Sequence, residues 1–155
     1  MSGKAQTVGE ELGSGWLKGK FESHFNVRIP ASATNRSYSV TEFILEKGDS
    51  TPVHIHTKEE EYLLVLEGTA RVLFGDETID VPAGTSVTLP RGIQHAWGNA
   101  SDEPLRATMT AVPGGCEEAL TLLAEKGDTL DLPALLAIAE KYGVESVGPP
   151  LLSKK

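Results

Sequence analysis

The sequence predicts an all-β domain, a sandwich or barrel, followed by a short pair of helices. Two observations lead to this prediction. From Leu17 onward the chain consists of short runs of β-favouring residues, which Gly, Pro, Asn and Asp separate at close spacing. Many short strands of this kind are typical of a sandwich or barrel. After Pro113 the composition changes to Ala, Leu and Glu, which favour helix.

The expected strands each end at a turn signal. Gly48-Asp49 and Gly75-Asp76 are examples, because Gly and Asp readily adopt the backbone angles that turns require. We expect strands over residues 18–29, 38–46, 52–56, 61–67, 69–74, 77–81, 85–89, 93–98 and 105–111.

Two helices are expected near the C-terminal end. The first runs from Cys116 to Lys126 and ends at Gly127, whereas Asp131 can cap a second helix that stops at Gly143. The second helix carries an apolar stripe, and such a stripe is far more often a packing surface than a ligand site. The stripe consists of Leu132, Leu135, Leu136, Ala139 and Tyr142.

These patterns divide the chain into three parts. Residues 1–15 are polar and rich in glycine, which predicts a flexible leader. Residues 16–113 form the β domain, and residues 114–155 form a helical extension that we expect to pack on the β domain or on a partner.

Composition narrows the class of protein. With 155 residues the chain is long enough for one domain with a sizeable core. The formal net charge of −8 argues against nucleic-acid binding, which needs clustered Lys and Arg. No apolar run approaches the roughly 20 residues that span a bilayer, so we expect a soluble protein with no membrane partner. A single cysteine and no signal-peptide pattern predict a cytoplasmic location.

Four residues stand out as candidate metal ligands. His54 and His56 lie two residues apart on a predicted strand, and therefore point to the same face. Glu61 begins the next strand, and His95 follows a turn that Pro90 marks. Three imidazoles and one carboxylate can hold a divalent metal without filling its coordination sphere.

The spacing of these residues resembles that of the cupin superfamily. Gly48 to Gly68 matches the motif G(X)5HXH(X)3,4E(X)6G, and Gly84 to Asn99 matches the motif G(X)5PXG(X)2H(X)3N, at every fixed position. The resemblance implies a cupin-type β-barrel or jelly roll with a metal inside one end. It also implies that the metal ligands are His54, His56, Glu61 and His95. Glu59 and Glu60 are alternative carboxylates, and the motif spacing favours Glu61.

Strand parity predicts which residues surround the metal. Leu63 shares a strand face with Glu61, Trp97 and Ile93 share one with His95, and Met109 lies on the inward face of residues 105–111. If the ligands face inward, so do these side chains. We therefore expect a mostly apolar cavity for a small-molecule substrate, with Leu63, Trp97 and Met109 in its wall.

The opposite face of the 61–67 strand is also apolar. Tyr62, Leu64 and Leu66 lie there, where an exposed barrel wall would carry polar residues. Residues 18–29, the C-terminal helices or a second subunit are the candidates to cover it. We expect a homodimer.

The ligand set leaves the metal open and suggests its chemistry. Imidazole and carboxylate suit a divalent transition metal such as Fe, Ni, Mn, Co, Zn or Cu. Four protein ligands leave two octahedral positions for a substrate, which the metal polarises as a Lewis acid. Glu61 is the ligand able to act as a catalytic base.

The resemblance to small quercetinase-like cupins, which extends to the C-terminal helices, implies a metal-dependent dioxygenase acting on a small apolar or aromatic enol. A non-oxidative isomerase, decarboxylase or lyase is the first alternative. A non-catalytic cupin that binds a metal or a small ligand is the second.

Other residues that could carry chemistry are given plainer roles. His24 alternates with apolar neighbours, and we expect it to face solvent. Cys116 precedes two glutamates that raise a thiol pKa, which favours a structural role. The scattered positions of Arg71, Arg91 and Arg106 argue against a phosphosugar substrate, which needs several cations around its phosphate.

Overall fold

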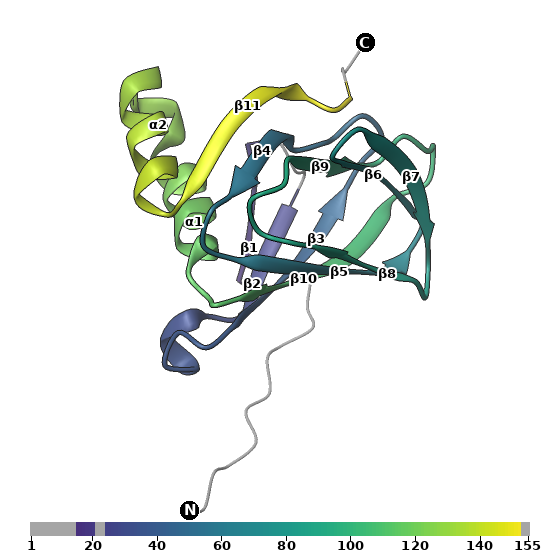
Figure 1. Cartoon of the computed structure of the whole chain (residues 1–155), viewed down its shortest axis with the longest axis horizontal. Helices are drawn as coiled ribbons and strands as arrows, with labels where there is room; N and C mark the ends of the chain where they lie inside the picture. The colour runs from purple at the N-terminus through teal and green to yellow at the C-terminus, as the bar shows by residue number, and fades with distance from the viewer. Residues whose placement is uncertain (1–14, 21–23, 153–155) are drawn as a thin grey trace, which may run out of the picture.

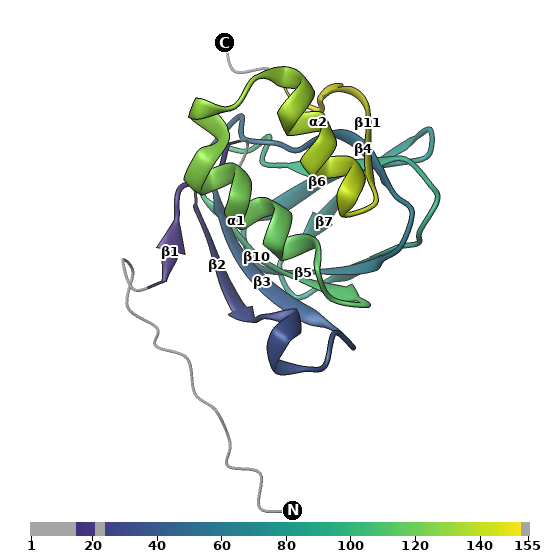
Figure 2. The same cartoon turned by 90° about the vertical axis from the view of Figure 1, so that its left-hand side faces the viewer.

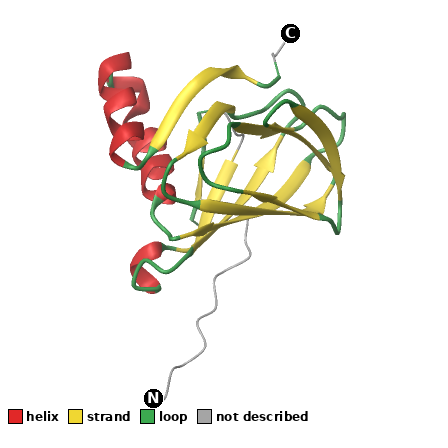
Figure 3. Ribbon diagram, viewed as in Figure 1, coloured by secondary structure: helices red, strands yellow, loops and turns green. Residues whose placement is uncertain are grey.

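Two antiparallel sheets face each other as a jelly roll, and the helices lie to one side of them (Figure 1, Figure 3). The computed structural model describes residues 15–20 and 24–152. The first sheet has the strand order β1-β2-β3-β10-β5-β8, and the second has the order β11-β4-β9-β6-β7. This arrangement confirms the predicted all-β class with a C-terminal helical pair.

The strand bounds follow the predicted runs closely in the middle of the chain. The strands are β1 Trp16–Leu17, β2 His24–Ile29, β3 Ser39–Leu45, β4 Pro52–His56, β5 Glu60–Glu67, β6 Thr69–Phe74, β7 Glu77–Pro82, β8 Ser86–Leu89, β9 His95–Gly98, β10 Leu105–Val112 and β11 Val144–Pro150. Of the run expected over 18–29, the structure describes residues 24–29 as strand β2, which pairs with β1 just before that run. Ile93 lies before β9 and is exposed, so it does not share the inward face of His95.

The core lies between the two sheets. Side chains alternate along β5 and β10, so that Leu63, Val65 and Ala107 are fully buried while their sequence neighbours are not. This period of two is expected for a strand with one face on a core. The outer face of β5 stays exposed: the relative exposure is 39% for Tyr62 and Leu64. Neither β2 nor the helices cover it within the described residues, contrary to two of our three candidates.

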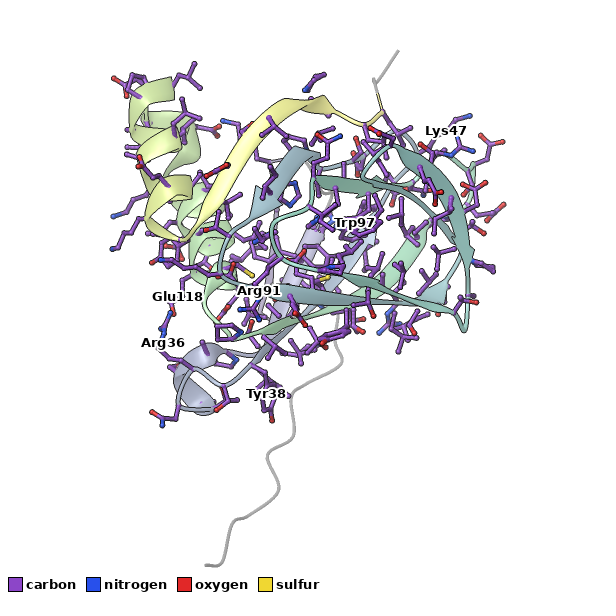
Figure 4. The ribbon with its side chains drawn as sticks, viewed as in Figure 1. Arg36, Tyr38, Lys47, Arg91, Trp97 and Glu118 are labelled. Carbon is purple, nitrogen blue, oxygen red and sulfur yellow. The ribbon has the colours of Figure 1, made fainter. Side chains whose placement is uncertain are left out.

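The helical extension consists of α1 Cys116–Lys126, a short 3-10 turn at Gly127–Thr129, and α2 Leu132–Lys141. A further 3-10 turn, Ala31–Ala33, precedes β3. The side chain of Asp131 caps α2, because its Oδ1 accepts from the backbone N–H of Ala134 at 3.0 Å. Arg36 and Glu118 point toward one another in Figure 4 and form an ion pair of 2.7 Å that ties the β2–β3 connection to α1. Neither described helix has the length and apolarity to cross a bilayer.

The sequence did not predict β11. This strand follows α2 and pairs with β4, placing Val144 opposite His56 and Ser146 opposite His54 (Figure 1). Gly148 and two prolines obscure its pattern, yet prolines are tolerated on an edge strand, where a missing N–H breaks no ladder. The strand that carries two candidate ligands is therefore held between β11 and β9.

Of the expected leader, residues 1–15, the structure describes only Gly15. The leader stays a prediction.

Candidate metal centre

Three strands from both sheets bring the four candidate ligands together. His54 and His56 lie on β4, and His95 begins β9 directly opposite His54 in the ladder. Glu61 lies near the start of β5 in the facing sheet. The cluster therefore bridges the two sheets where these strands meet.

The four side chains converge closely. One ligand atom from each residue lies within 4.8 Å of those of the others. Glu61 Oε1 is 3.3 Å from Nε2 of His56, and its Oε2 is 3.1 Å from Nε2 of His95. His56, Glu61 and His95 are buried, whereas His54 is half-buried.

Hydrogen bonds on the outer side of two histidines orient their nitrogens. Nδ1 of His54 lies 2.6 Å from the carbonyl oxygen of Pro52, and Nδ1 of His56 lies 3.2 Å from a carboxylate oxygen of Glu59. Both partners are acceptors, so each Nδ1 carries the hydrogen, and in the neutral ring each Nε2 presents a lone pair. These two Nε2 atoms are 3.1 Å apart and cannot bond to each other in that state. A cation between them removes the repulsion, so the donor set fits a metal.

The ionisation states of Glu61 and His54 also suit a metal. Burial alone would raise the pKa of Glu61, but His56 and His95 outweigh it and lower the pKa to about 2. Burial, followed by the neighbouring His56 and His95, lowers the pKa of His54 to about 4. Burial opposes the charged form of His56 as well, yet the carboxylates of Glu61 and Glu59 raise its pKa overall. Near neutral pH, Glu61 is therefore ionised and His54 neutral, the forms that bind metals.

The structure separates the three glutamates at residues 59–61. Glu61 alone of the three belongs to the converging cluster. Glu59 is buried behind His56, where it orients the ring. Glu60 faces away, accepting a hydrogen bond from Tyr62 Oη at 3.1 Å and lying 3.6 Å from Arg91.

A cavity of about 310 Å³ opens from the cluster, with His54, His56 and Glu61 in its lining. Trp97 and Met109 line it as well, and Figure 4 places Trp97 inside the barrel. The ring of Phe43, another lining residue, packs edge-on against Trp97 with their centroids 5.2 Å apart. Leu63, which we expected in this wall, is fully buried in the core instead.

The helical side of this cavity was not predicted from the sequence. α1 contributes Leu120 and Leu123 to the lining, and α2 contributes Leu132 and Leu136. We had interpreted the α2 stripe as a packing surface. Periodicity alone gives the same signal for a stripe that packs and a stripe that lines a cavity.

Cys116 also lies in the cavity wall, with its Sγ 3.9 Å from Oε1 of Glu61. Burial raises the pKa of its thiol well above the usual range, and the carboxylate of Glu61 adds to this effect. The direction agrees with our expectation, although the main cause is burial rather than the adjacent glutamates. The side chain of Glu117 instead accepts hydrogen bonds from the backbone N–H groups of Ala31 and Gly115.

Positive charge is sparse around the cavity. Lys20 is the one lysine or arginine among the described lining residues, and it is exposed. Arg71 and Arg106 form ion pairs elsewhere, Arg71 with Asp80 at 3.0 Å and Arg106 with Glu42. His24 is exposed at the start of β2, apart from the histidine cluster.

Two further motif residues support the loops around the site. Gly68 adopts a φ of 78°, and a side chain there would place its Cβ 2.5 Å from the carbonyl oxygen of Pro104. Asn99 is fully buried, and its Nδ2 donates to the carbonyl oxygens of Leu45 and Glu103. These residues shape the strand connections rather than bind a ligand.

Comparisons with known proteins agree with this architecture. Residues 41–111 match the family model of the cupin domain. Mannose-1-phosphate guanylyltransferase 2 of Escherichia coli O157:H7 is 34% identical over 68 residues, which are 44% of this chain. The chain spans only 14% of the length of that curated relative.

Several solved structures share the fold. A predicted oxalate decarboxylase from Thermotoga maritima superposes with a TM-score of 0.56 at 18% identity, covering 58% of this chain and 79% of that chain. The cupin domain of Schizosaccharomyces pombe Cnp3 gives a TM-score of 0.54 at 18% identity, with coverages of 71% and 74%. The polyketide cyclase RemF from Streptomyces resistomycificus gives 0.53 at 26% identity, with coverages of 62% and 68%. Residues 41–111 of this chain, which hold both motifs and all four candidate ligands, are therefore the part that is similar to the cupin domain.

Proposed function

We propose that this chain is a metal-dependent enzyme that acts on an apolar substrate through an enolic or phenolic oxygen. One observation carries the proposal: His54, His56 and Glu61 of the converging four-residue cluster line a cavity whose remaining wall is mostly hydrocarbon. Small-molecule sites have this character, with a few polar groups at one place in an apolar pocket.

A divalent transition ion, such as Fe, Ni, Mn, Co, Zn or Cu, suits three imidazoles and a carboxylate. His54 and His56 would bind it through Nε2, the atom that their Nδ1 hydrogen bonds leave with a lone pair. His95 and Glu61 complete the set. When bound, such an ion acts as a Lewis acid that polarises a substrate oxygen.

The remaining residues have roles that follow from their positions. Glu59 holds the ring of His56 in one orientation. Glu61 presents two carboxylate oxygens, so one can bind the ion while the other accepts a proton from the substrate. Trp97 and Met109 form walls that favour a flat apolar molecule and exclude water.

We propose dioxygenation as the reaction, with both atoms of O2 entering an electron-rich enol. Support comes from the motif resemblance to quercetinase-like cupins and from the apolar lining. A non-oxidative rearrangement at the same Lewis acid is the second candidate. The likeness to the polyketide cyclase RemF, at 26% identity, favours it. A phosphosugar substrate is disfavoured because a phosphate needs several cationic side chains around it. Among the described lining residues, Lys20 is the one lysine or arginine.

Metal analysis tests the ligand assignment. We expect protein purified without added metal to carry close to one equivalent of a transition metal per chain. Elemental mass spectrometry measures this content. His54→Ala and His95→Ala should lose it, because each removes a converging donor. His24→Ala is the matched control, since that histidine is exposed and outside the cluster. If the two cluster variants kept their metal while remaining folded by circular dichroism, the assignment would be wrong.

Oxygen consumption separates the reactions. Protein loaded with Fe, Ni, Mn or Co is offered flavonols and other enols in an oxygen electrode. Uptake that His54→Ala abolishes and His24→Ala retains supports dioxygenation. Conversion of an enol without uptake supports the non-oxidative candidate. Binding with no conversion under any metal identifies a non-catalytic cupin.

A further inference from the structure

We propose that the apolar faces of α1 and α2 form a second subsite, which binds the hydrocarbon tail of an elongated substrate. The oxygen-bearing head of the same molecule lies at the four ligands. The head position rests on the proposed function, whereas the tail position goes beyond it and can be tested separately.

Both helices present a single face to the cavity. On α1 the lining residues are Cys116, Ala119, Leu120 and Leu123, and their spacing of i, i+3, i+4 and i+7 is that of one helical stripe. Figure 2 shows α1 and α2 in front of the barrel strands. Both helices contribute side chains to the lining of the cavity. The lining of one cavity thus includes three of the four candidate metal ligands, His54, His56 and Glu61, and this stripe.

The second helix repeats the pattern. Its lining residues are Leu132, Leu135, Leu136 and Ala139, again at i, i+3, i+4 and i+7. None of the residues of α2 is buried, and the relative exposure is 67% for Leu132 and 49% for Leu136. An amphipathic helix ordinarily buries such a stripe against a core. Here the stripe borders a cavity, so a hydrocarbon ligand would supply the missing apolar contact.

The hydrogen bonds at the two ends of α2 do not involve its leucines. At the N-terminal end the side chain of Asp131 caps the helix. At the other end Tyr142 Oη donates to Glu118 at 3.3 Å, and the carbonyl oxygen of Gly143 accepts from N–H and Oγ1 of Thr57. The leucines of α2 therefore remain available to contact a ligand.

The chemistry of the lining defines the tail. No residue that α1 or α2 contributes to it is charged, so the tail should be an uncharged alkyl or aryl group. The volume of about 310 Å³ lies at the lower end of the roughly 300–1,000 Å³ usual for small-molecule sites. An elongated molecule with a metal-binding head and one hydrocarbon tail matches this cavity.

A homologous series of straight-chain hydroxamates, from acetyl to octanoyl, tests the tail subsite by calorimetry on the metal-loaded full chain. The hydroxamate head binds metals, and only the tail changes. We expect affinity to rise up to about fourfold for each methylene that enters the subsite. Primary alcohols of the same lengths are titrated into metal-free protein. If the affinity of these alcohols for the metal-free protein rises with chain length, the tail subsite is supported even if the metal assignment fails.

Substitutions on α2 test whether this helix causes the rise in affinity with chain length. Leu136→Asp should remove most of the gain with chain length and leave acetohydroxamate binding unchanged, because only the tail reaches that position. Ala137→Asp introduces the same charge on an exposed position outside the lining, and should keep the gain. Ala139→Phe should shorten the longest chain accepted, and serves if Leu136→Asp fails to fold.

A flat series in the wild type, or equal slopes in Leu136→Asp, Ala139→Phe and Ala137→Asp, would overturn the proposal. A loss of self-association in Leu136→Asp, seen by sedimentation with no change in slope, would assign the stripe to a protein interface instead.

Discussion

The barrel wall and the helical wall of the cavity are both apolar, but different interactions hold their side chains. Trp97 and Phe43 on the barrel side are 2% and 4% exposed, and their rings contact each other. On α2, Leu132 and Leu136 are 67% and 49% exposed. The barrel residues therefore serve stability and the site together, whereas these α2 residues border the site and contribute little to the core. This difference makes the two roles separable by substitution.

The largest expected effect is on stability. Phe43→Ala should lower the free energy of unfolding by about 3–5 kcal/mol, because it leaves a cavity in a packed core. Leu136→Ala should change it by no more than about 0.5 kcal/mol, as is usual for an exposed position. Urea denaturation followed by circular dichroism gives both values. A similar cost for the two variants would show that α2 is part of the core and would remove the contrast.

The barrel side was largely predictable from sequence. Glycine and proline punctuation together with alternation placed the central strands, and the spacing of His54, His56, Glu61 and His95 matched a cluster that does converge. Leu63 shows a limit of predicting cavity-lining residues from strand alternation. It shares a face with Glu61 but does not line the cavity, whereas Met109, its partner in the β5–β10 ladder, does. Strand parity alone does not separate these two positions.

The C-terminal side was less predictable. The periodicity of residues 132–142 established a helix with one apolar stripe, but the same stripe is expected whether it packs or lines a cavity. β11 was not predicted because Pro149 and Pro150 favour a loop over a strand. Only its pairing with β4 reveals the strand. Both outcomes depend on tertiary contacts that no local pattern contains.

The next largest expected effect is on metal affinity, and it concerns Glu59, which lies behind the ring of His56. Glu59→Gln should weaken metal binding about tenfold, because a neutral amide holds and polarises the ring less well than a carboxylate. Competition with a chromophoric chelator measures this. Glu60→Gln is the matched control, since that side chain contacts Tyr62 and Arg91 instead of the cluster. Equal affinities in the two variants would mean that Glu59 does not tune the site.

β5 repeats the contrast between buried and exposed apolar residues within one strand. Its inner face carries Leu63 and Val65, which have no exposed surface. Its outer face carries Tyr62, Leu64 and Leu66, which are each about two-fifths exposed in the described part of the chain. The homodimer predicted from sequence would bury this row, and it stays a prediction.

Leu64→Glu tests the homodimer with the smallest expected effect on the fold. The free energy of unfolding of the isolated chain should change by no more than about 0.5 kcal/mol, because Leu64 lies outside the core. Sedimentation should show a dimer for the wild type and a monomer for the variant, because a charge in an apolar interface is costly to bury. Ile79→Glu, at a similarly exposed position on β7, should remain dimeric. A monomeric wild type, or a variant that still dimerises, would leave the outer face of β5 without this role and restrict the function of the strand to its inner face.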